Sequence, residues 1–132
     1  MITVKSSHEL KIMSKAGQIA KAALLAAGDL VAPGVTTREL DNCARKVIEA
    51  AGATPSFLGY GGFPATICCS VNDEVIHGFP GDYVIKEGDI VSIDVGAIYD
   101  GYHGDCACTF GAGKISPEAQ KLIDVTRQSF YE

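Results

Sequence analysis

The 132-residue sequence lacks the patterns that define several common classes of protein. Lys and Arg total 11 against 16 Asp and Glu, the net charge is −5, and no cluster of basic residues occurs. This excludes nucleic-acid binding as the main function, because neutralising phosphates requires grouped cationic side chains. No apolar stretch approaches about 18 residues, and no basic segment with a following apolar run opens the chain. We therefore expect a soluble cytoplasmic protein without membrane contact.

Paired cysteine motifs and a phosphate-binding loop are also absent. The chain has five cysteines, an odd number, and none follows the Cys-x-x-Cys spacing of a structural zinc site. We expect Cys106 and Cys108 to be reduced residues packed in the core. Residues 56–64 are rich in glycine and aromatic side chains, but no Gly-Lys-Ser/Thr follows them. This segment is consistent either with a loop that caps the core or with the wall of a pocket.

A β-hairpin centred on Asp100-Gly101 is the clearest feature that is present. The dipeptide separates two runs rich in β-branched, aromatic and small apolar residues, which is typical of a tight hairpin turn. With a two-residue loop, Asp94 and Asp105 share one face of the ribbon, with Cβ atoms roughly 5 to 8 Å apart. The opposite face is then apolar and carries Val91, Ile93, Val95, Ala97, Cys106, Cys108 and Phe110.

Two aspartates so close together have two interpretations. They can be solvated carboxylates on an exposed sheet face, since surface carboxylates are common. They can instead form part of a divalent metal site, because like charges at this distance need a raised pKa, a cationic partner or a metal.

The rest of the chain predicts an α+β domain. Capping boxes at Ser6 and Thr36 open two amphipathic helices, over residues 6–30 and 36–51, that should cover the apolar face of an antiparallel sheet. Strands are expected at 65–71 and 75–80, before the hairpin. Ser116-Pro117 opens a third helix that reaches Glu132 without a stop signal, which we interpret as truncation or completion by a partner. His77, at the end of the second predicted strand, fits a structural role or a catalytic one.

Four segments together resemble a known family. Phe-Leu-Gly-Tyr at 57–60, Cys-Cys-Ser-Val-Asn-Asp-Glu-Val-Ile-His-Gly at 68–78, Gly-Asp-Ile-Val-Ser-Ile-Asp-Val-Gly at 88–96 and Asp-Gly-Tyr-His-Gly-Asp at 100–105 resemble the N-terminal half of a type I methionine aminopeptidase of the short bacterial form. The resemblance implies the N-terminal half of the pita-bread fold over residues 1–132. It also implies a metallopeptidase that removes the initiator methionine from nascent polypeptides.

The resemblance also implies a site. Asp94 would bind one metal and Asp105 would bridge two divalent ions, of Co, Mn, Fe or Zn, that activate a hydroxide. His77 would contact the substrate beside the scissile bond. The methionine pocket would be lined by Tyr60, Phe63 and Cys68, with Phe57 near its rim. Phe57 and Phe63 stand where we expect Cys and Tyr in relatives, which keeps the pocket apolar. The remaining histidine and glutamate ligands would lie beyond Glu132.

Two alternatives accompany this interpretation. A half-domain with an uncovered acidic face could be a non-enzymatic module that forms a homodimer or binds the missing C-terminal half. Prolidase and aminopeptidase P relatives share the aspartate pair and would act on Xaa-Pro peptides. Because two aspartates alone would bind metal weakly, we expect the 132-residue chain to be a fragment of the aminopeptidase that is inactive as a monomer.

Overall fold

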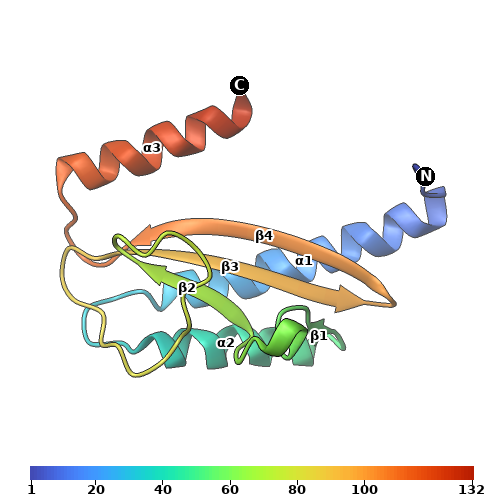
Figure 1. Cartoon of the computed structure of the whole chain (residues 1–132), viewed down its shortest axis with the longest axis horizontal. Coiled ribbons are helices and arrows are strands. Elements are labelled where there is room, and N and C mark those ends of the chain that lie inside the picture. The colour runs from blue at the N-terminus through green and yellow to red at the C-terminus, as the bar shows by residue number, and fades with distance from the viewer.

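The computed structural model describes all 132 residues as three helices and a small antiparallel sheet (Figure 1). The central strand β3 pairs with β4 along its whole length on one side, and with β2 and β1 on the other. The elements are α1 (Ser7–Asp29), α2 (Thr37–Ala50), β1 (Thr54–Pro55), a short 3₁₀ turn (Tyr60–Gly62), β2 (Ile67–Val71), β3 (Ile90–Tyr99), β4 (Tyr102–Gly111) and α3 (Pro117–Tyr131). The predicted α+β class is confirmed.

Both predicted capping boxes form and set the starts of α1 and α2. The Ser6 hydroxyl accepts from the Glu9 amide at 3.3 Å, and the Glu9 carboxylate accepts from the Ser6 amide at 2.6 Å. Thr36 and Glu39 repeat this exchange at 3.3 and 2.7 Å. These bonds satisfy amides that a helix leaves without partners in its first turn.

The hairpin has the predicted two-residue turn. Asp100 and Gly101 both have positive φ, 48° and 80°, as a type I′ turn requires. In the resulting register Asp94 lies opposite Ala107, and Gly96 lies opposite Asp105. The two aspartates are therefore diagonal neighbours on one face of the sheet, as the parity of a two-residue loop predicts.

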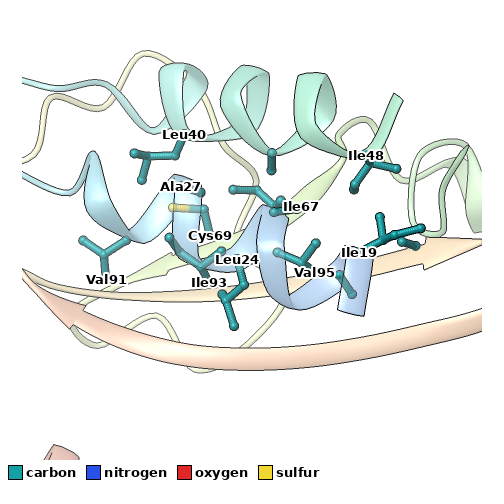
Figure 2. Packing of buried hydrophobic residues seen from close by; sticks show 14 of the residues in the cluster. Ile19, Leu24, Ala27, Leu40, Ile48, Ile67, Cys69, Val91, Ile93 and Val95 are labelled. Carbon is teal, nitrogen blue, oxygen red and sulfur yellow. The ribbon is translucent and has the colours of Figure 1, made fainter. Parts of the chain in front are cut away.

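The core lies between the other face of this sheet and the helices α1 and α2 (Figure 2). The face of β3 that was predicted to be apolar is fully buried. Figure 2 shows Leu40 and Ile48 of α2 and Leu24 and Ala27 of α1 pointing toward residues of β2 and β3. The buried side chains from the sheet include Ile67, Cys69, Val91, Ile93, Val95 and Ala97.

Three details of the sequence-based prediction are wrong. Residues 75–80 form no strand, because His77 adopts a left-handed backbone conformation (φ 59°) that breaks an extended chain. The strand predicted from residue 65 begins at Ile67. Cys108 is exposed rather than in the core, because β4 is an edge strand; Cys106 is partly buried against the core, and all five cysteines are free.

The third helix lies apart from this core. Ser116 caps it as predicted, with its hydroxyl accepting from the Ala119 amide at 3.1 Å. None of its residues is buried, and Figure 1 shows it on the side of the sheet away from α2. Its apolar residues Leu122, Val125 and Phe130 are exposed. None of the three helices has the length and apolarity needed to span a membrane.

Candidate metallopeptidase half-site

The candidate site is the face of the sheet that α1 and α2 leave uncovered. Asp94 of β3 is half-buried and Asp105 of β4 is exposed. On the β2 side, Cys68 lies directly opposite Asp94 in the register and therefore shares its face. Three of the predicted site residues are thus brought together by strand pairing alone.

The pair of aspartates is electrostatically unfavourable without a cation. Burial, and then the neighbouring Asp105 carboxylate, raise the pKa of Asp94 from 3.8 to about 6, while the charge of His77 acts in the opposite direction. The Oδ1 atom of Asp94 is buried and accepts no hydrogen bond. An orphaned carboxylate oxygen beside a second carboxylate fits the oxygen donor set of a divalent metal.

The chain supplies only part of such a site. No group of three or more His, Cys, Asp or Glu side chains is arranged to hold a metal ion. Cys68 shares this face, and burial and then the nearby carboxylates raise the pKa of its thiol to about 11. The two aspartates fit a divalent ion as two of its ligands.

His77 belongs to the segment that connects β2 to β3. The next residue, Gly78, donates its amide to the Ser70 hydroxyl at 3.1 Å and accepts from the Cys69 amide at 2.9 Å. A Cβ atom at Gly78 would collide with the Cys69 carbonyl oxygen. The bend at His77 is therefore held directly against β2, and the exposed His77 side chain lies within electrostatic range of Asp94.

The same segment is anchored at its far end by α2. The amides of Thr37 and Arg38, at the start of that helix, donate to the carbonyl oxygens of Tyr83 and Gly81 at 3.1 and 3.0 Å. These amides have no partner within the helix. The helix start thus fixes the path of the connection that carries His77.

Aromatic residues form a wall beside the aspartates. Phe57 packs edge-to-face on Phe63, with ring centroids 6.4 Å apart, and Phe63 packs on Phe79 at 5.2 Å. The Phe57 ring also covers Gly96, the residue opposite Asp105. Tyr60 is 82% exposed and does not join this stack.

Two glycines permit the close contacts around the pair. A Cβ atom at Gly96 would lie 2.7 Å from the Ser56 Cβ and 2.8 Å from the Phe57 ring. A Cβ atom at Gly104 would collide with the α1 backbone at Ala16 and Gly17. Sequence reasoning missed both glycines, since nothing local identifies which distant segment approaches them. It also gave no partner to His103, whose Nδ1 lies 3.0 Å from the Ser56 hydroxyl.

The cavity nearest in sequence to this site does not include it. A cavity of about 290 Å³ next to Thr37, Asp73 and Tyr83 contains none of the predicted site residues. Asp105 is exposed on this face, whereas the Oδ1 atom of its neighbour Asp94 is buried.

A sheet covered by two helices on one face, with a carboxylate pair on the other, is the arrangement expected for half of a pita-bread fold. The model of metallopeptidase family M24 matches residues 11–132, and the chain belongs to that family.

Known proteins confirm the predicted fold and the resemblance to methionine aminopeptidases. The methionine aminopeptidase of Clostridium perfringens is 53% identical over 132 residues, which are 100% of this chain and 53% of that protein. The methionine aminopeptidase structure from Rickettsia prowazekii has a TM-score of 0.94 at 38% identity, covering 97% of this chain and 52% of that one. The Xaa-Pro dipeptidase of Bacillus anthracis has a TM-score of 0.76 at 31% identity, covering 89% of this chain and 32% of that one. This chain therefore spans about half the length of the curated relatives that it matches.

Proposed function

We propose that this chain provides the aspartate-bearing half of the active site of an aminopeptidase that removes N-terminal methionine from newly made proteins. The observation that carries the proposal is the pair of Asp94 and Asp105 on the open face of the sheet, with the Asp94 Oδ1 atom buried and unpartnered. The 53% identity to a methionine aminopeptidase supports this activity over others in the family. Newly made proteins as substrates imply a cytoplasmic location.

Asp94 and Asp105 would hold the divalent metal in this proposal. A bound divalent metal supplies a hydroxide at neutral pH and polarises the scissile carbonyl. Binding it would relieve the repulsion between the two carboxylates and give the Asp94 Oδ1 atom a partner. Family membership supports a divalent metal without distinguishing Co, Mn, Fe or Zn.

The neighbouring residues would bind and orient the substrate. His77, held over β2, would donate a hydrogen bond to the peptide next to the bond that is cleaved. The rings of Phe57 and Phe63, together with Cys68, offer an apolar surface suited to a methionine side chain. Tyr60 stays in the proposal as a residue that would join this surface when further polypeptide covers the site.

The 132-residue chain should be inactive by itself. Two carboxylates leave the metal charge undercompensated, and the chain offers no third ligand. The relatives that it matches are about twice as long. The residues that complete the site are therefore expected in the half of the relatives that this chain does not match.

The test uses two proteins. The first is the 132-residue chain, and the second joins it to the unmatched half of the Clostridium perfringens enzyme. Both are assayed with Mn(II) or Co(II) for release of methionine from Met-Ala-Ser. We expect turnover only in the joined protein, with loss of that turnover in Asp94→Ala and little change in Asp29→Ala, a control at an exposed aspartate at the end of α1. A joined protein that folds and cleaves Xaa-Pro peptides but not Met-Ala-Ser would refute the methionine activity.

A homodimer is the second candidate. The absence of buried residues in α3, together with the open face of the sheet, leaves a surface that a second copy could cover. Turnover by the 132-residue chain that is lost in Asp94→Ala would favour this candidate. A single 13.8 kDa species in sedimentation at tens of micromolar would count against it.

A further inference from the structure

We propose that His103 is a positioning residue. Through Ser56 it holds the 56–64 loop against the carboxylate face of the sheet, so that Phe57 stays over Gly96 beside Asp105. The imidazole Nδ1 and the Ser56 Oγ atom are 3.0 Å apart, and the tautomer of the ring sets which one donates.

The 56–64 loop has few polar connections to the sheet. The Ser56 amide donates to the Gly96 carbonyl oxygen at 3.0 Å, and the Ser56 hydroxyl bonds to His103. The next backbone hydrogen bonds stay within the loop. The Gly59 amide donates to the Phe63 carbonyl oxygen at 2.8 Å, and the Phe63 amide donates to the Tyr60 carbonyl oxygen at 2.9 Å. Beyond the loop, the Asp41 carboxylate accepts from the amides of Thr66 and Ile67 at 2.8 and 2.9 Å. Ser56 is therefore the front anchor of the loop, and Asp41 is the rear one.

The position of the front anchor decides where the aromatic wall lies. Ser56 and Phe57 both contact the space above Gly96, which is opposite Asp105 in the register. Phe57 then contacts Phe63, and Phe63 contacts Phe79, two residues after His77. A shift of Ser56 would consequently be transmitted along the rings from the Asp105 side of the site to the His77 side.

The three consecutive residues His103, Gly104 and Asp105 of β4 have different surroundings. Gly104 faces α1, where its missing Cβ lets the helix backbone approach. Because side chains alternate along a strand, His103 and Asp105 both lie on the opposite, open face. Packing in the core therefore does not account for His103, which is exposed and whose hydrogen bond is to Ser56.

One part of this inference rests on the proposed function, namely that the rings of Phe57, Phe63 and Phe79 line the substrate site. The hydrogen bond and its effect on the loop can be tested without catalysis. Failure of the test would leave the proposed activity standing, and failure of the activity assay would leave the role of His103 in the loop standing.

The experiment measures amide hydrogen exchange of the 132-residue chain by NMR. We expect His103→Ala to speed exchange at Ser56, Gly59 and Phe63 about three- to tenfold, the effect of losing one hydrogen bond. Amides of Ile93 and Val95 in the central strand should keep their wild-type rates. His103→Asn should restore slow exchange in the loop, because the asparagine amide can either donate to or accept from Ser56.

A matched control lies on the same hairpin and face. The hydroxyls of Ser92 and Thr109 are hydrogen-bonded at 2.8 Å, away from the 56–64 loop. Thr109→Ala removes this bond and should leave exchange in the loop unchanged. Ser56→Ala should reproduce the effect of His103→Ala, and the double variant should add nothing further.

Three results would overturn the proposal. The first is unchanged exchange in the loop of His103→Ala. The second is equal acceleration in the loop and at Ile93 and Val95, which would indicate a general loss of stability. The third is an additive double variant, which would show that His103 does not act through Ser56.

Discussion

Removing the charge of Asp94 should stabilise this chain when no metal is bound. Burial and the neighbouring Asp105 raise the pKa of Asp94 to about 6 from 3.8. Asparagine has nearly the shape of the protonated carboxyl group and does not ionise. Asp94→Asn therefore tests the charge with little change in packing.

The sign of the effect follows from proton binding. Between about pH 4 and pH 6 the folded chain keeps a proton on Asp94 that the unfolded chain releases, so the free energy of unfolding falls as pH rises through this window. The gap between 3.8 and about 6 is roughly two pH units, which at 1.36 kcal/mol per unit gives an upper limit of about 3 kcal/mol. Water screens a half-exposed carboxylate, so we expect about 1 to 2 kcal/mol.

The assay is urea unfolding in the presence of EDTA at several pH values between about 4 and 8. The wild-type chain and Asp94→Asn should have similar stability near pH 4, and the variant should be the more stable above about pH 6. Asp73→Asn is the control, because Asp73 is exposed, and the substitution removes one carboxylate without altering the pair of Asp94 and Asp105.

The reasoning is refuted if the difference between Asp94→Asn and wild type is constant with pH, or if wild type is the more stable at pH 8. With Mn(II) in excess, the difference in free energy of unfolding between Asp94→Asn and wild type at high pH should become smaller or change sign. An ion that binds only the folded wild-type chain stabilises it. Mn(II) that stabilises Asp94→Asn as much as wild type would argue against Asp94 as a ligand.

Two further predictions concern the frame that supports the site. Gly104→Ala should lower the free energy of urea unfolding by ~3 kcal/mol or more, because the added methyl group meets the backbone of α1; Gly17→Ala, with open space around it, should instead raise it by about 0.5 to 1 kcal/mol. Equal effects of these two substitutions would show that α1 does not lie against β4 as described. Tyr102→Phe removes a 2.7 Å hydrogen bond to Glu9, whose pKa is lowered to about 2 chiefly by the Ser6 amide and then by Tyr102. A lowered pKa of Glu9 stabilises the folded chain at pH values above the ordinary pKa of a glutamate, and this stabilisation is lost as the pH falls toward 2. Tyr102→Phe should therefore have a lower Tm than wild type at neutral pH. Its Tm should also fall less than that of wild type on acidification.

Local patterns predicted the hairpin and the aspartate pair well. The Asp100-Gly101 turn and the alternation along β3 and β4 are properties of neighbouring residues, so they fixed the face of Asp94 and Asp105 before any tertiary contact was known. The capping boxes at Ser6 and Thr36 were predictable for the same reason.

Side-chain burial was predicted less well than the elements themselves. The spacing of apolar residues in the first helix predicts that Leu10 faces the core, but Leu10 is 54% exposed, whereas Ile19 is buried. Small residues such as alanine blur the edges of a stripe, because they are tolerated on either side of a helix.

The segment between β2 and β3 shows where local patterns fail. Residues 75–80 contain the β-branched and aromatic residues typical of a strand, but the chain turns at His77, and Gly78 is hydrogen-bonded to Cys69. The far end of the segment is held by the first amides of α2, those of Thr37 and Arg38, which bond to Tyr83 and Gly81 more than 40 residues later in the chain. No propensity of the segment itself predicts these partners.

The sequence by itself thus determined the helices, the hairpin register and the shared face of the two aspartates, because each depends on residues close together in the chain. Only the tertiary structure decided that the Asp94 Oδ1 atom is left without a partner, that α1 lies against Gly104, and that Ser56 reaches His103. These features join segments separated by tens of residues, and their geometry follows from how the sheet and helices pack as one body.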